Sequence, residues 1–139
     1  LLTGVWGREV QLVTNEWRYT RGPQGKNMPQ TMWSNRWSTM PIGSMPDFKM
    51  PMPDNRAVLD FMPGSTVPVI RQPFREGDML PFWAYAKKYE TIMFNRAEDP
   101  DETVNRIDDS IAKEAEELLR VALHSVDAPS EQFERLALN

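Results

Sequence analysis

The single histidine of the chain, His124, is the first side chain to consider for acid–base chemistry, because an unperturbed histidine titrates near neutral pH. It stands near the carboxyl end of a predicted helix, and Arg120 and Asp127 are the charged residues close to it in sequence. The helical neighbours of His124 carry no nucleophile, so a catalytic triad would need groups from distant parts of the chain. We therefore favour an interaction of His124 with the exposed carbonyls of the helix end.

A run of acidic residues suggests a calcium loop, because several of its oxygen-bearing side chains alternate as EF-hand ligands do. These residues are Asp99, Asp101, Thr103 and Asn105. Val104, however, stands where an EF-hand loop needs glycine, and Ser110 stands where it needs a bidentate glutamate. A turn that leads into the N-terminus of a helix explains the same residues and is the preferred interpretation.

Residue types and spacing exclude two other chemistries. The chain has no cysteine, which rules out disulfides, thiolate catalysis and cysteine-based metal sites. The basic loop from Arg21 to Lys26 contains glycine but lacks the spacing of a phosphate-binding loop, so we expect a solvent-facing loop.

A cluster of aromatic and basic residues, Trp33, Arg36 and Trp37, could stack on a nucleotide base or another ring. The formal net charge of −4 and the pI of about 5.0 argue against nucleic acid as the main partner, because nucleic-acid affinity is largely cation-driven. No segment approaches the roughly 18 uninterrupted apolar residues of a membrane span. Burial of the cluster under a neighbouring domain is the preferred alternative. The compartment is not indicated.

The elements that would position these residues begin with a predicted hairpin in residues 1–22. Residues 8–14 alternate around Val10 and Leu12, and residues 17–20 follow after Asn15-Glu16. A two-residue turn of the primed type needs positive φ at both positions, which Glu16 adopts reluctantly, so a longer loop is the alternative.

A long segment, residues 23–82, is rich in proline, methionine and tryptophan. Ten of the twelve prolines and eight of the nine methionines lie between Pro23 and Pro81. So much proline argues against long helices and central strands, while the aromatic content argues against a disordered tether. We expect irregular, extended chain wrapped over an apolar surface, with residues 66–71 as an edge strand or an extended segment because Pro68 interrupts them.

Residues 83–139 are predicted to contain a strand, a turn and two helices. Residues 91–94 favour a strand, and Asp99-Pro100-Asp101 indicates a turn. Residues 107–126 predict an amphipathic helix with Asn105 as its N-cap, and Pro129 fits the first position of a second helix. The apolar stripe of the first helix comprises Ile107, Ile111, Ala115, Leu118, Leu119, Ala122, Leu123 and Val126.

Several segments, taken in order, resemble the C-terminal region of bacterial sulfatases. Residues 7–23 (GREVQLVTNEWRYTRGP) are similar to a strand, turn and strand of the "vtdgryky.r.p" type, with Asn15-Glu16 in place of Asp-Gly. Residues 94–105 resemble a "LYDLxxDPxExxN" segment, with Asn95 in place of Asp. Residues 127–136 (DAPSEQFERL) resemble the ending "DAPPEQyeRLGL", the most specific of the matches. Residues 32–35 and 39–41 are similar to "lyxYtlMP", although Ile42-Gly43 departs from the Thr-His that often follows.

This resemblance implies a parent enzyme of the arylsulfatase type, in the alkaline-phosphatase superfamily, that uses a formylglycine made from Cys or Ser in a C/S-x-P-x-R motif and a calcium-type cation. It places both in a larger N-terminal domain. The nearest seryl candidate here, Ser44 in SMPDF, lacks the Arg, so no catalytic residue and no metal ligand can be transferred to this chain. The implied fold is α+β, a small antiparallel sheet of about four strands packed against a C-terminal helix, within one subdomain covering residues 1–139.

The expected function is therefore that of a sulfatase's C-terminal portion, which packs on the catalytic domain and is not catalytic alone. A chain that starts at Leu1 and not at Met fits this expectation. Lys26, Trp33, Arg36 and Trp37 are the candidates for the rim of the substrate pocket, the cations steering an anionic ester and the indoles stacking on its leaving group. Packing between domains is the plainer interpretation of the same residues. A free-standing interaction domain derived from a sulfatase, a homo-oligomer, and phosphonate in place of sulfate chemistry remain open.

Overall fold

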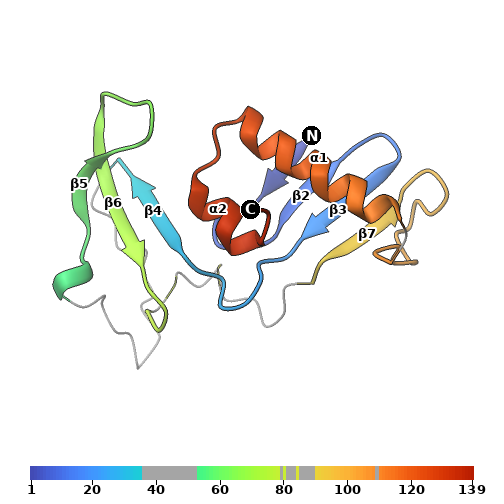
Figure 1. Cartoon of the computed structure of the whole chain (residues 1–139), viewed down its shortest axis with the longest axis horizontal. Coiled ribbons are helices and arrows are strands. Elements are labelled where there is room, and N and C mark those ends of the chain that lie inside the picture. The colour runs from blue at the N-terminus through green and yellow to red at the C-terminus, as the bar shows by residue number, and fades with distance from the viewer. Residues whose placement is uncertain (36–52, 79, 81–83, 85–89, 109) are drawn as a thin grey trace.

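A computed structural model describes residues 1–35, 53–78, 80, 84, 90–108 and 110–139 (Figure 1). The described residues form two antiparallel sheets and two C-terminal helices, so the predicted α+β class is confirmed. The strands are β1 (Leu2–Gly4), β2 (Val10–Val13), β3 (Trp17–Arg21), β4 (Gln30–Ser34), β5 (Val58–Phe61), β6 (Pro68–Phe74) and β7 (Ile92–Asn95). The helices are a short 3-10 turn, η1 (Pro53–Asn55), and the α-helices α1 (Ile111–Ser125) and α2 (Ser130–Leu136).

The larger sheet has four strands in the order β1-β2-β3-β7. The sulfatase resemblance implies a sheet of about this number of strands. The predicted hairpin is present as β2 and β3, with Val13 opposite Arg18. Its turn is not of the primed type, because neither Asn15 nor Glu16 has a positive φ. The hydroxyl of Thr14 accepts hydrogen bonds from the backbone N–H groups of Glu16 (3.3 Å) and Trp17 (2.9 Å), so a side chain closes the turn.

Helices α1 and α2 cover one face of this sheet and share a core with it (Figure 1). Alternating residues of β2 and β3 face the helices, and Val10, Leu12 and Tyr19 are buried there. The most deeply buried side chains are Tyr19, Met93, Leu119 and Leu136, which come from β3, β7, α1 and α2. The ends of the sequence are therefore joined through one core.

Helix α1 begins at Ile111, four residues later than predicted. The prediction that Asn105 is the N-cap is wrong, because Ser110 occupies the cap position, without a side-chain hydrogen bond. The Oδ1 atom of Asn105 instead accepts hydrogen bonds from the backbone N–H groups of Met93 (3.0 Å) and Ile107 (3.1 Å). Asn105 therefore satisfies a donor of β7, which a sequence pattern cannot show.

The buried face of α1 is narrower than the predicted stripe. Its buried residues are Ala112, Ala115, Leu119 and Leu123, at spacings of three and four. Leu118 is 48% exposed and Val126, which follows the helix, is 59% exposed. Because each residue turns about 100° around the helix axis, Leu118 is directed away from the sheet that Leu119 contacts.

The second helix forms as predicted, one residue later at its start. Pro129 is the N-cap of α2 and not its first helical residue, because its ψ of 151° is extended. Phe133 and Leu136 are buried in the shared core, and the ring of His124 stacks on Phe133 at a centroid distance of 4.4 Å. The C-cap, Ala137, adopts a left-handed conformation that ends the helix.

The segment expected to be irregular contains a second sheet, in the order β4-β6-β5. Strand β6 is the central strand, so the prediction of an edge strand at residues 66–71 is wrong, as is the argument that proline excludes a central strand here. Pro68 is the first residue of β6 and Pro73 the next to last, so residues 69–72 keep the N–H groups that a ladder needs. Residues 36–52 of this segment, and residues 85–89 after it, lie outside the described residues.

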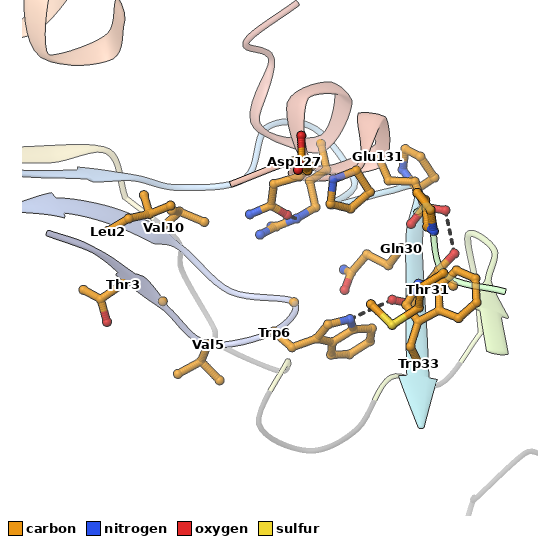
Figure 2. Close-up of a pocket in the computed structure, with 18 residues that line it drawn as sticks. Leu2, Thr3, Val5, Trp6, Val10, Gln30, Thr31, Trp33, Asp127 and Glu131 are labelled. Atoms are coloured by element: carbon orange, nitrogen blue, oxygen red, sulfur yellow. Dashed lines mark hydrogen bonds between the residues drawn. The ribbon is translucent and has the colours of Figure 1, made fainter. Parts of the chain in front are cut away.

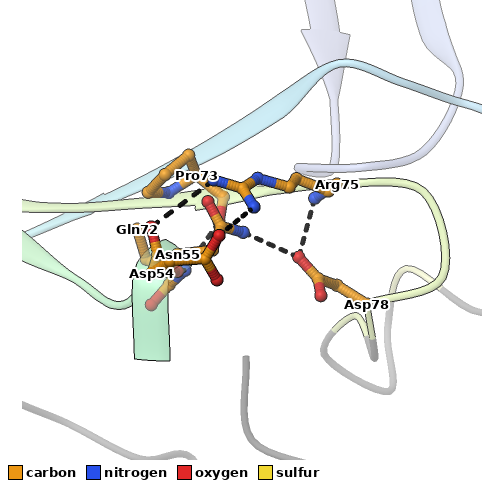
Figure 3. A network of polar contacts seen from close by, with 6 residues as sticks. All are labelled: Asp54, Asn55, Gln72, Pro73, Arg75 and Asp78. Carbon is orange, nitrogen blue, oxygen red and sulfur yellow. Dashed lines mark hydrogen bonds and ion pairs between the residues drawn. The ribbon is translucent and has the colours of Figure 1, made fainter. Parts of the chain in front are cut away.

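A polar network holds η1 against the end of β6 (Figure 3). The amide Nδ2 of the buried Asn55 donates to Oδ2 of Asp78 (2.9 Å), and Gln72 Nε2 donates to the carbonyl of Asn55 (2.8 Å). Asp78 also accepts the backbone N–H of Arg75, whose guanidinium pairs with Asp54 at 2.9 Å. Each buried polar group has a partner within the network, which indicates a structural role.

Candidate functional site

A pocket of about 520 Å³ lies where the edge of the larger sheet, strand β4 and the junction of the two helices meet (Figure 2). The residues that follow β1 form one side, β4 a second, the helix junction a third, and the tip of the β5–β6 hairpin contributes at the margin. The lining residues are Leu2, Thr3, Gly4, Val5, Trp6, Gly7, Val10, Pro29, Gln30, Thr31, Trp33, Met62, Pro63, Asp127, Pro129, Glu131, Gln132 and Arg135. A volume of this size is typical of small-molecule sites.

Two indole rings contribute aromatic surface to the pocket. Trp6 is fixed by a hydrogen bond from its Nε1 to the carbonyl of Thr31 (2.9 Å) and by a tilted contact with Phe74, with the centroids 5.5 Å apart. Trp33 stands on β4, and the guanidinium carbon of Arg71 lies 5.8 Å from the centre of its ring. The positions of both rings are thus set by contacts with other residues of the chain.

Carboxylates form the opposite, polar side at the helix junction. Glu131 accepts a 2.6 Å hydrogen bond from the hydroxyl of Thr31, which ties α2 to β4. Asp127 is exposed and has a φ of 51°, a left-handed conformation that aspartate tolerates better than most residues. Together these residues bring two carboxylates to one side of the pocket.

Among the described residues, Arg135 is the only positively charged one that lines the pocket, and its nitrogens already donate hydrogen bonds to the protein. Its Nε donates to Gln132 Oε1 (2.7 Å), its Nη1 to Asn27 Oδ1 (3.0 Å) and its Nη2 to the carbonyl of Arg8 (2.8 Å). The side chain is buried, so these bonds hold the loop after β1 and the loop before β4 against α2. The guanidinium of Arg135 therefore stabilises the fold, and its nitrogens are occupied by protein acceptors.

Gln30 presents a hydrogen-bond acceptor without a protein partner. The residue is 4% exposed, its Nε2 donates to the carbonyl of Asn27 (2.6 Å), and its Oε1 has no partner. Figure 2 shows its side chain extending from β4 into the space beside Trp6. Gly7 makes room for the amide, because a Cβ at that position would lie 2.8 Å from the Gln30 oxygen.

The hydroxyl and carboxylate pair of Thr31 and Glu131 has the geometry of a nucleophile and a base, but a structural role explains it better. Thr31 is buried, and its hydroxyl already donates to the carboxylate across two elements. A base in such a pair is normally oriented by a third group, and Glu131 has no further hydrogen bond within the described residues. The Thr31–Glu131 hydrogen bond therefore serves to attach α2 to β4.

The structure brings one of the four predicted rim residues into this pocket. Trp33 lines it, whereas Lys26 is exposed, pairs with Glu76 at 2.5 Å and is not part of the lining. Arg36 and Trp37 lie outside the described residues. Sequence reasoning missed Trp6. The signal that could have indicated it is an aromatic residue directly before a glycine, Gly7, which adopts a positive φ. It also missed Gln30 and Glu131, for which the sequence carries no signal.

The other residues considered for chemistry are not placed in the pocket lining. His124 is exposed in the last turn of α1 and stacks on Phe133. Asp99 accepts hydrogen bonds from the backbone N–H of Val104 (2.8 Å) and from the hydroxyl of Thr103, and the first of these is the main reason why its pKa is lowered. The predicted turn at this point is confirmed. Ser44 lies outside the described residues.

Within the described residues, no group of three or more His, Asp or Glu side chains is arranged to hold a metal ion. In the same part of the chain, neither helix has the length and apolar character required to cross a membrane. Comparison of the chain with protein-family models, with curated proteins and with solved structures gave no match.

Proposed function

We propose that this chain is the C-terminal portion of a sulfatase, a sulfuric ester hydrolase. It packs on a catalytic domain, contributes to the margin of the substrate pocket, and does not hydrolyse esters by itself. The catalytic domain supplies the formylglycine and the divalent cation that the resemblance implies. Whether the parent acts on sulfates or on phosphonates is decided in that domain.

The observation that carries the proposal is the structural role of the most sulfatase-like segment, residues 127–136. This segment forms the helix junction and α2, and its Phe133 and Leu136 complete the core between α1 and the four-stranded sheet. The order of hairpin, strand, turn and C-terminal helices agrees with the subdomain that the resemblance implies. The motif residues are thus those on which the fold depends.

Exposed apolar surface on the β5–β6 hairpin also supports packing on a larger body. Leu59 is 69% exposed and Phe61 is 55% exposed, and Val58, Met62 and Val67 add to the same hairpin. Exposed apolar residues concentrated in one element are typical of a surface that another protein domain covers. A catalytic domain would be that covering body.

A free-standing interaction domain derived from a sulfatase is the second candidate. It is favoured by the core between the larger sheet and the two helices, in which Met93, Leu119 and Leu136 are completely buried. A fixed near-ultraviolet signal from tryptophan and a cooperative thermal transition of the isolated chain would favour this candidate. Aggregation with a weak signal would favour the severed portion of a larger enzyme.

Two observations test the proposal: the sequence encoded upstream of this chain in the same reading frame, and the sulfatase activity of the whole protein. We expect a C/S-x-P-x-R motif upstream, and we expect the whole protein to hydrolyse 4-nitrophenyl sulfate in the presence of calcium while residues 1–139 alone release no nitrophenol. Absence of the motif, or turnover by the isolated chain above a mock preparation, would contradict the proposal.

A further inference from the structure

We infer that the pocket between Trp6, Gln30 and Glu131 binds an uncharged, hydroxylated ring of the kind found in sugars. The inference concerns this pocket alone and does not depend on the proposed function. It rests on three properties of the pocket: its volume, its aromatic surface, and the predominance of hydrogen-bond acceptors among its available polar groups.

The acceptors select for a ligand rich in hydrogen-bond donors. Asp127 and Glu131 contribute carboxylates, and Gln30 contributes a buried amide oxygen that has no protein partner. A buried polar atom without a hydrogen bond costs stability, so a ligand hydroxyl that reached the amide oxygen would remove that cost. A carboxylate that accepts from a hydroxyl forms one of the stronger classes of hydrogen bond.

The same arrangement disfavours an anionic ligand. The two carboxylates outnumber the single guanidinium of Arg135, and the guanidinium nitrogens already donate to protein atoms. The Trp6 indole N–H is likewise used by the carbonyl of Thr31. A sulfate or phosphate group would therefore meet like charge without strong donors that could compensate for its desolvation.

The indoles favour a ring over an extended chain. One face of a sugar ring carries aliphatic hydrogens, which pack well on an indole, while its edge carries hydroxyls. A pocket with Trp6 and Trp33 on one side and carboxylates at the helix junction matches both kinds of surface (Figure 2). Its volume of about 520 Å³ is sufficient for a small ligand of this class.

Direct binding to the folded chain tests the inference. The probes are the methyl β-glycosides of glucose, galactose and N-acetylglucosamine. Their binding is measured by saturation-transfer NMR and by the change in tryptophan fluorescence. We expect at least one to bind with a dissociation constant on the order of 1 mM. Inorganic sulfate and tetramethylammonium, which carry the alternative charges, should bind more weakly.

Isosteric substitutions at the helix junction locate the site. Glu131→Gln keeps an acceptor for the Thr31 hydroxyl but removes the charge, and we expect about a tenfold loss of affinity, the size of one strong hydrogen bond. Asp127→Asn should also weaken binding, and asparagine tolerates the left-handed backbone at this position. The matched control is Glu134→Gln, an exposed residue of the same helix outside the lining, which should leave affinity unchanged.

Three results would overturn the inference. One is that none of the glycosides binds to protein with a native tryptophan signal. Another is that sulfate or tetramethylammonium binds more tightly than all three. The last is that both Glu131→Gln and Asp127→Asn fold and bind a glycoside as the unsubstituted chain does.

Discussion

At the scale of single residues, the hydroxyl of the buried Tyr19 lies in a polar environment that the sequence does not show. The hydroxyl of Tyr19 lies 3.3 Å from a carboxylate oxygen of Glu116, and the guanidinium of Arg21 pairs with the same oxygen at 2.8 Å. Desolvation of the buried ring is the main reason why the pKa of Tyr19 is raised, with Arg21 acting in the opposite direction. The folded state therefore favours the protonated phenol.

This raised pKa predicts a loss of stability in alkali. Because the pKa of Tyr19 is higher in the folded than in the unfolded state, its contribution to stability is complete below about pH 10, the unfolded value, and declines as the pH rises toward the folded value. The free energy of unfolding, measured by urea denaturation at increasing pH, should fall more steeply in the unsubstituted chain than in Tyr19→Phe. Parallel profiles would show that Tyr19 does not ionise differently in the two states.

At the scale of elements, one arginine joins the N-terminal sheet to the C-terminal helices. Arg21 of β3 donates from Nε to the carbonyl of Leu136 (2.8 Å) and from Nη2 to that of Ala137 (3.2 Å), in addition to its pair with Glu116 of α1. Its side chain is 15% exposed, so the bond to Leu136 and the pair with Glu116 are partly sheltered from competing water, whereas the bond to Ala137 is exposed. Arg21 thus fixes the end of α2 over the sheet.

Arg21→Ala is expected to destabilise the fold by about 1–3 kcal/mol, because it removes charge-assisted bonds and leaves helix-end carbonyls without a donor. The matched control is Arg120→Ala on α1, which breaks an exposed pair with Glu117 and should leave the free energy of unfolding nearly unchanged. Urea denaturation followed by tryptophan fluorescence measures both. Equal effects of the two substitutions would contradict the structural role assigned to Arg21.

At the scale of the whole molecule, the distribution of apolar surface differs between the two halves. The four-stranded sheet with α1 and α2 encloses a shared core, whereas the β5–β6 hairpin exposes Leu59 and Phe61 beyond the three-stranded sheet. In Figure 1 this hairpin lies at one end of the molecule, away from α1. A body that covers the chain would be expected to contact that end.

Polar substitution of the hairpin is therefore expected to change association more than folding. The double variant Leu59→Thr and Phe61→Thr introduces β-branched residues, which suit an exposed strand, so its thermal transition should remain within a few degrees of that of the unsubstituted chain. Its self-association, measured by analytical ultracentrifugation, should decrease. In the proposed full-length sulfatase, the same variant should weaken the packing of this portion on the catalytic domain and lower the thermal stability of the whole enzyme. Unchanged association would show that the hairpin is not an interaction surface.

The sequence by itself determined the local elements whose signals are short-range. Alternation around Val10 and Leu12 predicted the hairpin, the β-branched and apolar residues before Asn95 predicted β7, and the spacing of Ala115 and Leu119 predicted α1. These signals are readable because period and turn chemistry act between neighbouring residues. The α+β class was implied by the sulfatase resemblance and agrees with the order of these elements.

Only the tertiary structure decided where each element ends, how the strands are ordered and where the pocket lies. Asn105 was expected to cap a helix but binds the backbone of β7, since its acceptor satisfies a donor that is distant in sequence. The proline-rich segment was expected to be irregular, yet β6 pairs on both sides because Pro68 and Pro73 stand near its ends. The pocket needs Trp6, Gln30 and Glu131 together, and these residues meet only because the core brings α2 and β4 to the edge of the first sheet. No local pattern contains that information, because it arises from packing between residues separated by as much as 127 positions in the chain, as Arg8 and Arg135 are.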